Sequence, residues 1–528
     1  MAEVTAPARD TTPAPRGGLL LAVAIVAFGF LGSRILGVLR SVVIARAFGS
    51  SPELDAYLVA FKVPDLIFQL LAGATLGSAF IPVFARLYRR ESPDRAWELA
   101  SSVLNLVTTA TAAVCLVAFV FAPWLVPLTA PGLERMGRAI FLTRLMLLSP
   151  LLFSVSGMLT GILNARQRFF LPALAPMLYN VAIIFGALVL AKPFGVTGLS
   201  IGVIAGAACH LLVQVPGLFR ERMTYRLTFD WRDSAVREVG RLMGPRVIGL
   251  AAAQLNFFVT IYFASKIGGG AIANLNYAWI VATLPTALFG MALSTAVFPR
   301  LADHVAEEDL DALRDTISRV LRIIMFLTIP AAIGLAMLRF PATVVLFERG
   351  KFTDADAVMT ASALGFYCLG IVPQAGIEIH SRGFYALGDT RTPVVLAVLA
   401  VLMNLVLSAL LWKNFEHEGL AFSVSASSWL EWTLLYAFYL KRTGTRVVED
   451  LNAIALFTFC GAAMAFFLAI AFLPVEHHGR QSEAVIAVAG TIAGAAVYAG
   501  VAHALGVAEF QEAVQRLRAR IRPGVSRS

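Results

Sequence analysis

The sequence predicts an all-α polytopic membrane protein with about 14 transmembrane helices, and three observations support this fold class. First, 58% of the 528 residues are hydrophobic and only 14% are charged, with a mean hydropathy of +0.77. An average soluble domain carries about 25% charged residues, so this chain lacks the polar surface that a large soluble fold needs. Second, long apolar segments alternate with short polar breaks, and third, basic residues gather in alternate breaks.

The first predicted helix follows residues 1–18, which are rich in Ala, Pro and Thr and are expected to form a disordered tail. The run from Leu19 to Phe48 has no small-residue cleavage site before Arg34, which favours an uncleaved helix over a secretory signal. Glycine and proline clusters separate the later segments. The predicted spans are 19–48, 54–85, 98–128, 138–163, 171–191, 196–219, 240–266, 272–301, 316–339, 356–386, 392–412, 419–440, 450–473 and 484–506.

The distribution of Lys and Arg predicts the topology, because cytoplasmic loops carry more of both residues. If the first helix starts inside, the dense basic groups fall in the loops after even-numbered helices, as in Arg86–Arg95, Arg220–Arg241 and Lys441–Arg446. Both termini are therefore expected on the cytoplasmic side. The tail over 509–528 alternates apolar and basic residues at helical spacing, which predicts a helix on the anionic inner leaflet.

An internal repeat predicts two lobes. Leu71–Pro82 matches Leu288–Pro299 in its Leu, Gly, Ala and Pro residues, at an offset that spans six predicted helices. An even number of helices preserves orientation, so the repeats are parallel, an arrangement typical of transporters with a site between the lobes. Chance similarity between two apolar helices is the alternative. The predicted domains are an N-lobe, a C-lobe with a basic cytoplasmic lead-in, and two further helices, at 19–222, 223–445 and 446–508, before the tail.

Several functional classes are disfavoured. Each cysteine lies alone in an apolar run, so we expect neither a disulfide framework nor a zinc site; the four are Cys115, Cys209, Cys368 and Cys460. The net charge of +10 is spread over alternate loops, so we expect no nucleic-acid partner. The sequence has no HExxH, GxSxG or Walker motif, and we expect neither an enzyme nor a bound metal or cofactor.

Three arginines interrupt the first predicted helix, where an ionisable residue costs about 2.5–3.5 kcal/mol on insertion scales. Arg34 and Arg40 lie about 120° apart around a helix, and Gly37 lies midway, about 60° from each. Together they form a broad flank on which an anionic group can approach the backbone between two guanidinium forks. Arg46 lies near the helix end and can reach the membrane surface. The alternative is that these arginines pair with acids on neighbouring helices and only stabilise the fold.

The second predicted helix carries Asp55, Lys62 and Asp65. Asp55 and Lys62 share a helix face, but Asp55 follows a turn and is equally well explained as a cap of its own helix. Lys62 is expected to pair with one of these acids or to face the substrate, and Asp65 to neutralise a base. We assign Asp55, Asp65 and Arg46 to ion pairs or conformational contacts.

Fewer charges interrupt the later spans. Glu378 and Arg382 form an i,i+4 pair in the predicted span 356–386. Arg144, in the fourth span, is expected to face the interior of the N-lobe.

Several polar strings resemble the MurJ (MviN) family over roughly residues 20–445. They are Ser33–Arg40, Ala45–Gly49, Asp55–Pro64, Ala79–Pro82, Asn164–Phe169, Phe347–Thr353 and Phe384–Pro393. Polar strings of this length are uncommon inside an apolar protein, so the resemblance is specific.

The resemblance implies a lipid II flippase of the MOP exporter superfamily, in the bacterial cytoplasmic membrane. Such a protein moves the undecaprenyl-pyrophosphate-linked peptidoglycan precursor to the outer leaflet by alternating access, without ATP, so a membrane potential or ion gradient would supply the energy. Carried over by position, Arg34, Arg40 and Asp55 match the family's essential helix-1 and helix-2 residues, and Lys62 matches a basic residue of helix 2. Proteins of cell-wall synthesis are the expected partners.

The chain also departs from the family pattern. Phe68, Gln69 and Gly73 stand where many members have a basic and an acidic group, and Glu378 stands where Lys is common. Trp279 and Ile280 replace the family's Asp-Arg pair in helix 8. Three alternatives therefore stay open: a MOP flippase for another polyprenyl-linked oligosaccharide, a transport-dead scaffold for wall synthesis, and a multidrug exporter, which the basic first helix argues against.

Overall fold

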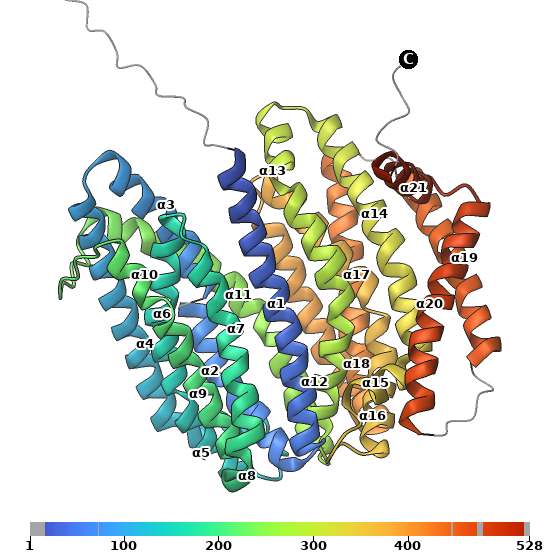
Figure 1. Ribbon diagram of the computed structural model, residues 1–528, viewed down its shortest axis with the longest axis horizontal. Coiled ribbons are helices and arrows are strands. Elements are labelled where there is room, and N and C mark those ends of the chain that lie inside the picture. Colours follow the sequence, from blue (N-terminus) through green and yellow to red (C-terminus); the bar gives the residue numbers. More distant parts are fainter. Residues whose placement is uncertain (1–15, 72, 445–446, 473–478, 522–528) are drawn as a thin grey trace, which may run out of the picture. The chain divides into compact units, whose positions relative to one another are not determined.

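A computed structural model describes residues 16–71, 73–444, 447–472 and 479–521 of the chain. The described residues are almost entirely helical and contain no β-strand, which confirms the predicted all-α polytopic class (Figure 1). Among them, 10 helices are long and apolar enough to cross a membrane, or up to 11 if one bent pair counts as a single span. The figure of about 14 spans stays a prediction. Helix α1 begins at Arg16, so the end of the segment predicted as a tail is helical.

The chain divides into two compact units, and each draws on separate stretches of sequence. Unit 1 comprises 1–40, 67–119 and 144–247, and unit 2 comprises 41–66, 120–143 and 248–528. The long helices α1 (Arg16–Phe48), α4 (Pro93–Thr129) and α11 (Ser234–Ile267) each contribute to both units. Residues 223–247 group with unit 1, and 41–66 and 120–143 group with unit 2, so the units have other bounds than the predicted lobes, which stay a prediction. The duplication itself stays a prediction.

Unit 1 is a bundle held together by aromatic residues and by close backbone contacts. Phe80, Phe84 and Trp97 lie in its core, with Phe84 and Trp97 edge to face. A Cβ on Gly198 would lie 2.1 Å from the carbonyl oxygen of Leu190, so only glycine permits this approach of two helices. Besides parts of the long helices, the unit contains α3 (Ala74–Arg90), α6 (Leu148–Ala165), α7 (Phe170–Phe185), the π-helix η1 (Gly186–Leu190), α8 (Ala191–Phe194), α9 (Val196–Leu212) and α10 (Val215–Arg220), and the end of α5 (Met136–Met146).

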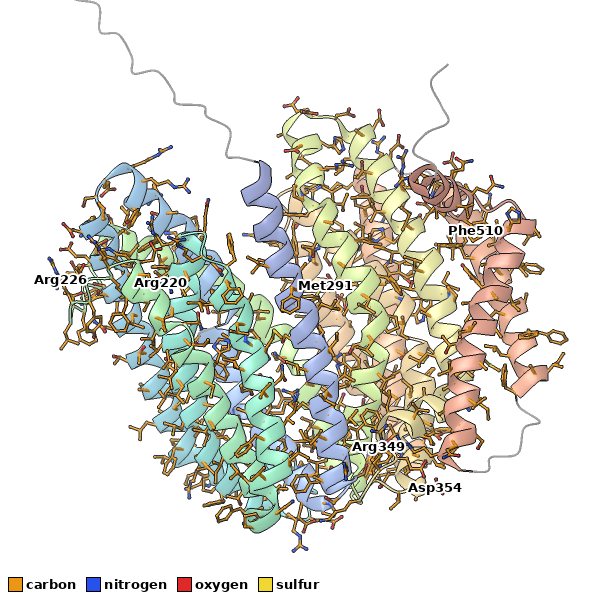
Figure 2. All side chains as sticks on the ribbon, viewed as in Figure 1. Arg220, Arg226, Met291, Arg349, Asp354 and Phe510 are labelled. Atoms are coloured by element: carbon orange, nitrogen blue, oxygen red, sulfur yellow. The ribbon has the colours of Figure 1, made fainter. Side chains whose placement is uncertain are left out.

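An irregular strap over residues 221–233 connects α10 to α11 and lies along α4. Asn105 on α4 donates to the carbonyl oxygens of Arg226 and Thr228, at 3.3 and 2.9 Å, and accepts from the Tyr225 hydroxyl at 2.8 Å. Figure 2 labels Arg220 and Arg226 at this end of the unit. The strap is therefore fixed by polar side chains of one helix instead of by regular secondary structure.

Unit 2 holds the remaining helices, apart from the end of α2 from Ile67 on, around a large apolar core that includes Ile324, Phe384 and Tyr439. The helices are α2 (Pro52–Leu71), α12 (Ala271–Pro285), the π-helix η2 (Thr286–Met291), α13 (Ala292–Ala306), α14 (Leu310–Met337), α15 (Arg339–Phe347), α16 (Asp354–Cys368), α17 (Ile371–Ala386), α18 (Arg391–Thr443), α19 (Val447–Phe472), α20 (Arg480–Ala504) and α21 (Ala508–Ile521). Figure 2 labels Arg349 and Asp354 at one end of this unit, Phe510 at the other, and Met291 between them.

One predicted span is bent, and one kinked helix covers two other predicted spans. The predicted span 356–386 is broken into α16 and α17, which meet at a bend of 44°. Helix α18 spans 53 residues and is kinked at Glu416, whose φ of 43° is not helical. Glu416 falls between the predicted spans 392–412 and 419–440, which explains how one continuous assignment covers both.

The start of the C-terminal helix α21 packs against unit 2. The ring of Phe510 lies 6.5 Å from that of Phe326, and Glu509 pairs with Arg322 of α14 at 3.5 Å. The predicted position of the 509–528 tail on the inner leaflet stays a prediction.

Candidate functional site

Unit 1 carries Arg34 and Arg40 on the continuous helix α1, so their expected separation of about 120° around the axis applies. Arg34 is exposed and Arg40 is partly buried. The Arg34 guanidinium carbon lies 5.4 Å from the centroid of the Phe30 ring. Among the described residues of unit 1, neither arginine forms an ion pair with a carboxylate. A Cβ placed on Gly37 would meet no atom within 4 Å, so the backbone between the two arginines is accessible in this unit.

Arg34 lines a cavity of unit 1 with about 1120 Å³ of empty space, between α1, α3, α6 and α7. Ser33, Thr160 and Asn164 supply its other polar side chains, and the remaining walls are apolar. The lining of this cavity contains no carboxylate, so the Arg34 guanidinium has no counter-ion among the described residues of unit 1. This is the arrangement expected of a cation that receives its counter-charge from an anionic ligand.

Arg144, in contrast, is engaged by the protein. Its Nε donates to the carbonyl oxygen of Phe119 on α4 at 3.0 Å, and its guanidinium lies 5.0 Å from the same ring. The Phe119 side chain is 46% exposed, so this contact lies at the surface of unit 1. The Arg144 side chain is itself partly buried, and its expected position facing the interior of the N-lobe stays a prediction.

Unit 2 carries Lys62 and Asp65 on α2. The Lys62 ammonium lies 4.6 Å from the centroid of the Phe257 ring, a cation–π distance, and Asp65 is close enough to act on it electrostatically. Lys62 lines a cavity that also contains Asn256, Asn276, Trp279 and Tyr367. Trp279 contacts both Phe257 and Tyr367 edge to face. Trp279, Phe257 and Tyr367 thus form an aromatic wall next to Lys62.

Asp55 binds the start of another helix. Its carboxylate is 4% exposed and accepts a hydrogen bond of 2.8 Å from the backbone N–H of Ala273, in the first turn of α12. The free N–H groups of a helix start and its dipole favour an anion at this position. The interpretation of Asp55 as a cap is thus right in kind, but the capped helix is α12 and not its own α2.

Further contacts surround Asp55 and hold residues 46–55 against α12 and α16. Ser50 donates to the side chain of Asn274, which also accepts from Thr360 at 3.0 Å. The Tyr277 hydroxyl donates to the carbonyl oxygen of Gly49 at 3.2 Å. The backbone oxygen of Arg46 accepts from Lys351 at 3.0 Å, while the Arg46 side chain is exposed. We call this set of contacts the α12 clasp.

Close backbone approach explains a glycine in the clasp. Gly270 precedes α12 with a φ of +83°, and a Cβ there would lie 2.1 Å from the carbonyl oxygen of Ser50. Any side chain at this position would be strained and would clash. The triple glycine before α12, which the sequence indicates only as a turn, is therefore also what admits the Ser50 segment.

Glu378 and Arg382 form the expected i,i+4 ion pair on α17, at 3.8 Å. Arg382 also donates to the Thr295 hydroxyl of α13 at 2.9 Å. The pair therefore connects two helices of unit 2. No group of three or more metal-binding side chains occurs among the described residues.

Sequence reasoning missed the α12 clasp and the aromatic wall. Ser50 and Asn274 are far apart in sequence, and a single hydroxyl or amide in an apolar segment is more often a packing residue. The one signal available in the sequence is the run of three glycines before the predicted helix. Trp279 is visible only as a departure from a family pattern, which says nothing about its neighbours.

A model of the family described as lipid II flippase MurJ matches residues 44–487 of the chain. The chain is 32% identical over 420 residues to the lipid II flippase MurJ of Burkholderia cenocepacia, covering 78% of this chain and 81% of the relative. It is 30% identical over 409 residues to the probable lipid II flippase MurJ of Buchnera aphidicola subsp. Acyrthosiphon pisum, covering 76% and 80%.

Solved structures show the same fold. A lipid II flippase MurJ in an inward closed conformation matches with a TM-score of 0.79 and 24% identity, over 91% of this chain and 98% of that one. An inward-facing multidrug resistance MATE transporter of the MOP superfamily matches with a TM-score of 0.66 and 16% identity, over 80% and 98%.

Proposed function

Because the chain belongs to the lipid II flippase MurJ family, we propose that it moves lipid II from the cytoplasmic to the outer leaflet of the bacterial cytoplasmic membrane. Both termini are then cytoplasmic, as the Lys and Arg distribution predicts. The proposed substrate is the undecaprenyl-pyrophosphate-linked peptidoglycan precursor. The same MOP fold supports alternating access as the transport mechanism.

The observation that carries this proposal is the state of Arg34 and Arg40. Both lie on a membrane helix, and neither has a carboxylate partner among the described residues of unit 1. Burying a charge without a partner costs free energy that structural pairing would avoid. A pyrophosphate offers the oxygen atoms that guanidinium forks bind in pairs, and the bond is stronger in low-dielectric surroundings than in water. The accessible backbone at Gly37 lets the head group approach between them.

Lys62, in unit 2, is also proposed to bind substrate. Its ammonium faces a cavity with two amide side chains and the aromatic wall of Phe257, Trp279 and Tyr367. The presence of Lys62 supports transport by this chain without the arginine that the resemblance implies in the eighth membrane span. Asp65, close to Lys62, keeps the cavity from carrying an uncompensated charge when substrate is absent.

We assign Asp55 and the α12 clasp to closure of one face of the transporter. A carboxylate on a helix start and the Ser50–Asn274 contact are separable without breaking either helix. Alternating access requires contacts of this kind, strong enough to close a face and weak enough to open. Energy for the cycle comes from a membrane potential or an ion gradient, and the protein acts as a transporter and not as a catalyst.

One feature of the sequence favours two alternative functions. Trp279 and Ile280 stand where the family resemblance implies an Asp-Arg pair. A protein without transport, which recruits cell-wall synthesis proteins, has no need of that arginine. A flippase for a different polyprenyl-linked oligosaccharide would use the aromatic wall for other sugars.

Complementation distinguishes these functions. The gene is expressed in a bacterium depleted of its own flippase, alongside Arg34→Ala and the control Arg90→Ala, an exposed arginine at the end of α3. We expect rescue by the parent and by Arg90→Ala, and no rescue by Arg34→Ala at equal membrane abundance. Rescue by all three would contradict the arginine mechanism, and rescue by none would favour the rivals.

A further inference from the structure

The cavity beside Arg34 has walls that the head-group mechanism does not use. Val26, Phe30, Ile81 and Phe169 are among its apolar lining residues, and only Ser33, Arg34, Thr160 and Asn164 in the lining are polar. A sugar or peptide head group would meet few hydrogen-bonding partners on such a surface, so its hydroxyl groups would lose hydration without compensation. The walls of this cavity are therefore better suited to contact a hydrocarbon chain.

Close packing of α1 against α7 shapes one side of this cavity. A Cβ on Gly29 would lie 2.6 Å from the Cβ of Ala173, so the two helix backbones touch at this point. Gly29 and Ala173 also line a second apolar hollow with about 510 Å³ of empty space, formed by Ile25, Phe28 and Met177 among others. The two hollows therefore lie next to each other, on the same α1–α7 contact.

The combined chemistry is a single guanidinium at the edge of a hydrocarbon-lined cavity. Its complement is a molecule in which a phosphate is joined directly to a long apolar chain. We propose, on the basis of the function above, that this cavity holds the first isoprene units of the substrate, those attached to the pyrophosphate that Arg34 binds. Binding there would bury apolar surface of the chain at about 25 cal/mol per Å² and fix the phosphate at the guanidinium.

Unit 1 would then recognise the lipid chain as well as the charge of the pyrophosphate. Phospholipids share the same chemistry, a phosphate with hydrocarbon, so the two sources must be separated by experiment. A branched prenyl chain begins at the phosphate itself, whereas phospholipid acyl chains begin beyond a glycerol. We therefore expect the cavity to prefer the prenyl pyrophosphate.

The test measures binding to the purified full-length protein in detergent. The probes are geranylgeranyl pyrophosphate, inorganic pyrophosphate and dioleoyl phosphatidic acid. Val26→Trp fills the cavity, and Ile35→Trp is the matched control, because Ile35 is 59% exposed on α1 and does not line this cavity. We expect Val26→Trp to weaken geranylgeranyl pyrophosphate binding about tenfold, leaving inorganic pyrophosphate unchanged, and Ile35→Trp to change neither.

Two results would overturn the proposal: wild-type prenyl affinity in Val26→Trp, or equal affinity of the parent for phosphatidic acid. Arg34→Gln tests the pyrophosphate site separately from the lipid-chain site, because we expect this variant to lose binding of both geranylgeranyl pyrophosphate and inorganic pyrophosphate. If Arg34→Gln binds both probes normally, the proposed function fails at its own step. If only Val26→Trp is without effect, the chain site fails and the arginine site stands.

A photocrosslinking measurement covers the case in which Val26→Trp does not fold. Benzoylphenylalanine replaces Phe169, a cavity residue, or Ile35 as the control. We expect a crosslink to geranylgeranyl pyrophosphate from position 169 and none from position 35. Equal crosslinking from both positions would contradict a specific site.

Discussion

The carboxylate of Asp55 on α2 accepts a hydrogen bond of 2.8 Å from the backbone N–H of Ala273 on α12. This contact joins two segments that are far apart in the chain, and both residues are buried. It fixes the start of α12 through a charge–dipole interaction that is worth more when partly desolvated than at a surface. The α12 clasp therefore depends on the Asp55 carboxyl group, which explains why an acidic residue stands near the start of a membrane helix.

Locking the clasp is expected to stop transport. Ser50→Cys and Asn274→Cys are combined to form a disulfide across the clasp, because these two side chains are hydrogen-bonded to each other. The exposed Cys209 is replaced by Ala in this background. Oxidation should abolish lipid II flipping in proteoliposomes, and reduction should restore it. Each single cysteine variant serves as the control. Undiminished flipping by fully crosslinked protein would show that the clasp does not open during transport.

Removing the charge of Lys62 is expected to slow transport without lowering the stability of the protein. Lys62→Met keeps the side-chain length but removes an ammonium from a largely apolar cavity, where a charge costs about 2.5–3.5 kcal/mol on insertion scales. The melting temperature in detergent should stay level or rise, while the flipping rate falls at least about tenfold. Lys62→Arg, which retains the charge, should keep most of the rate. Wild-type flipping by Lys62→Met would remove this residue from the substrate site.

Acid conditions are expected to weaken the end of unit 1 near the strap. Glu221 accepts hydrogen bonds from Nε of Arg166 and Arg168, at 2.7 and 2.8 Å. Burial raises the pKa of Glu221, but the hydrogen bonds and charges of the two arginines outweigh it, so the net pKa lies below its ordinary value of 4.5. A pKa lowered by folding stabilises the protein above the unfolded value, and this stability disappears as the pH falls through the folded value.

The measurement is the melting temperature of the full chain between neutral pH and pH values below 4.5, for the parent and for Glu221→Gln. The parent should be the more stable at neutral pH, and the difference should shrink as the pH falls below that value. A constant difference across the range would mean that the Glu221 carboxylate charge contributes nothing.

Much of the fold follows from local properties of the sequence. The predicted span 98–128 matches α4, and 484–506 matches α20, because an apolar segment in a membrane satisfies its backbone only as a helix. The membrane arginines Arg34 and Arg40 were predictable for the same reason, since a charge within such a segment has no local explanation.

What the sequence could not predict depends on partners distant in the chain. The bend between α16 and α17 falls at Gly370, just before Pro373; these two residues are local breakers, but they do not distinguish a bend inside one span from a turn between two. Asp55 has equally good local explanations as a cap of α2 and as a partner of Lys62, and only the packing of Gly270 against Ser50 brings the start of α12 to it. The strap has no regular secondary structure, and the side chain of Asn105 on α4, distant in the sequence, donates hydrogen bonds to the carbonyl oxygens of Arg226 and Thr228.

The most direct test of the account is lipid II flipping by the purified full chain in proteoliposomes under a membrane potential. A fluorescent lipid II is placed in the inner leaflet, and its appearance in the outer leaflet is followed for the parent, the double variant Arg34→Ala/Arg40→Ala, and Arg90→Ala. The account predicts flipping by the parent and by Arg90→Ala, and only the protein-free rate for the double variant. Flipping by the double variant at the parental rate would contradict it.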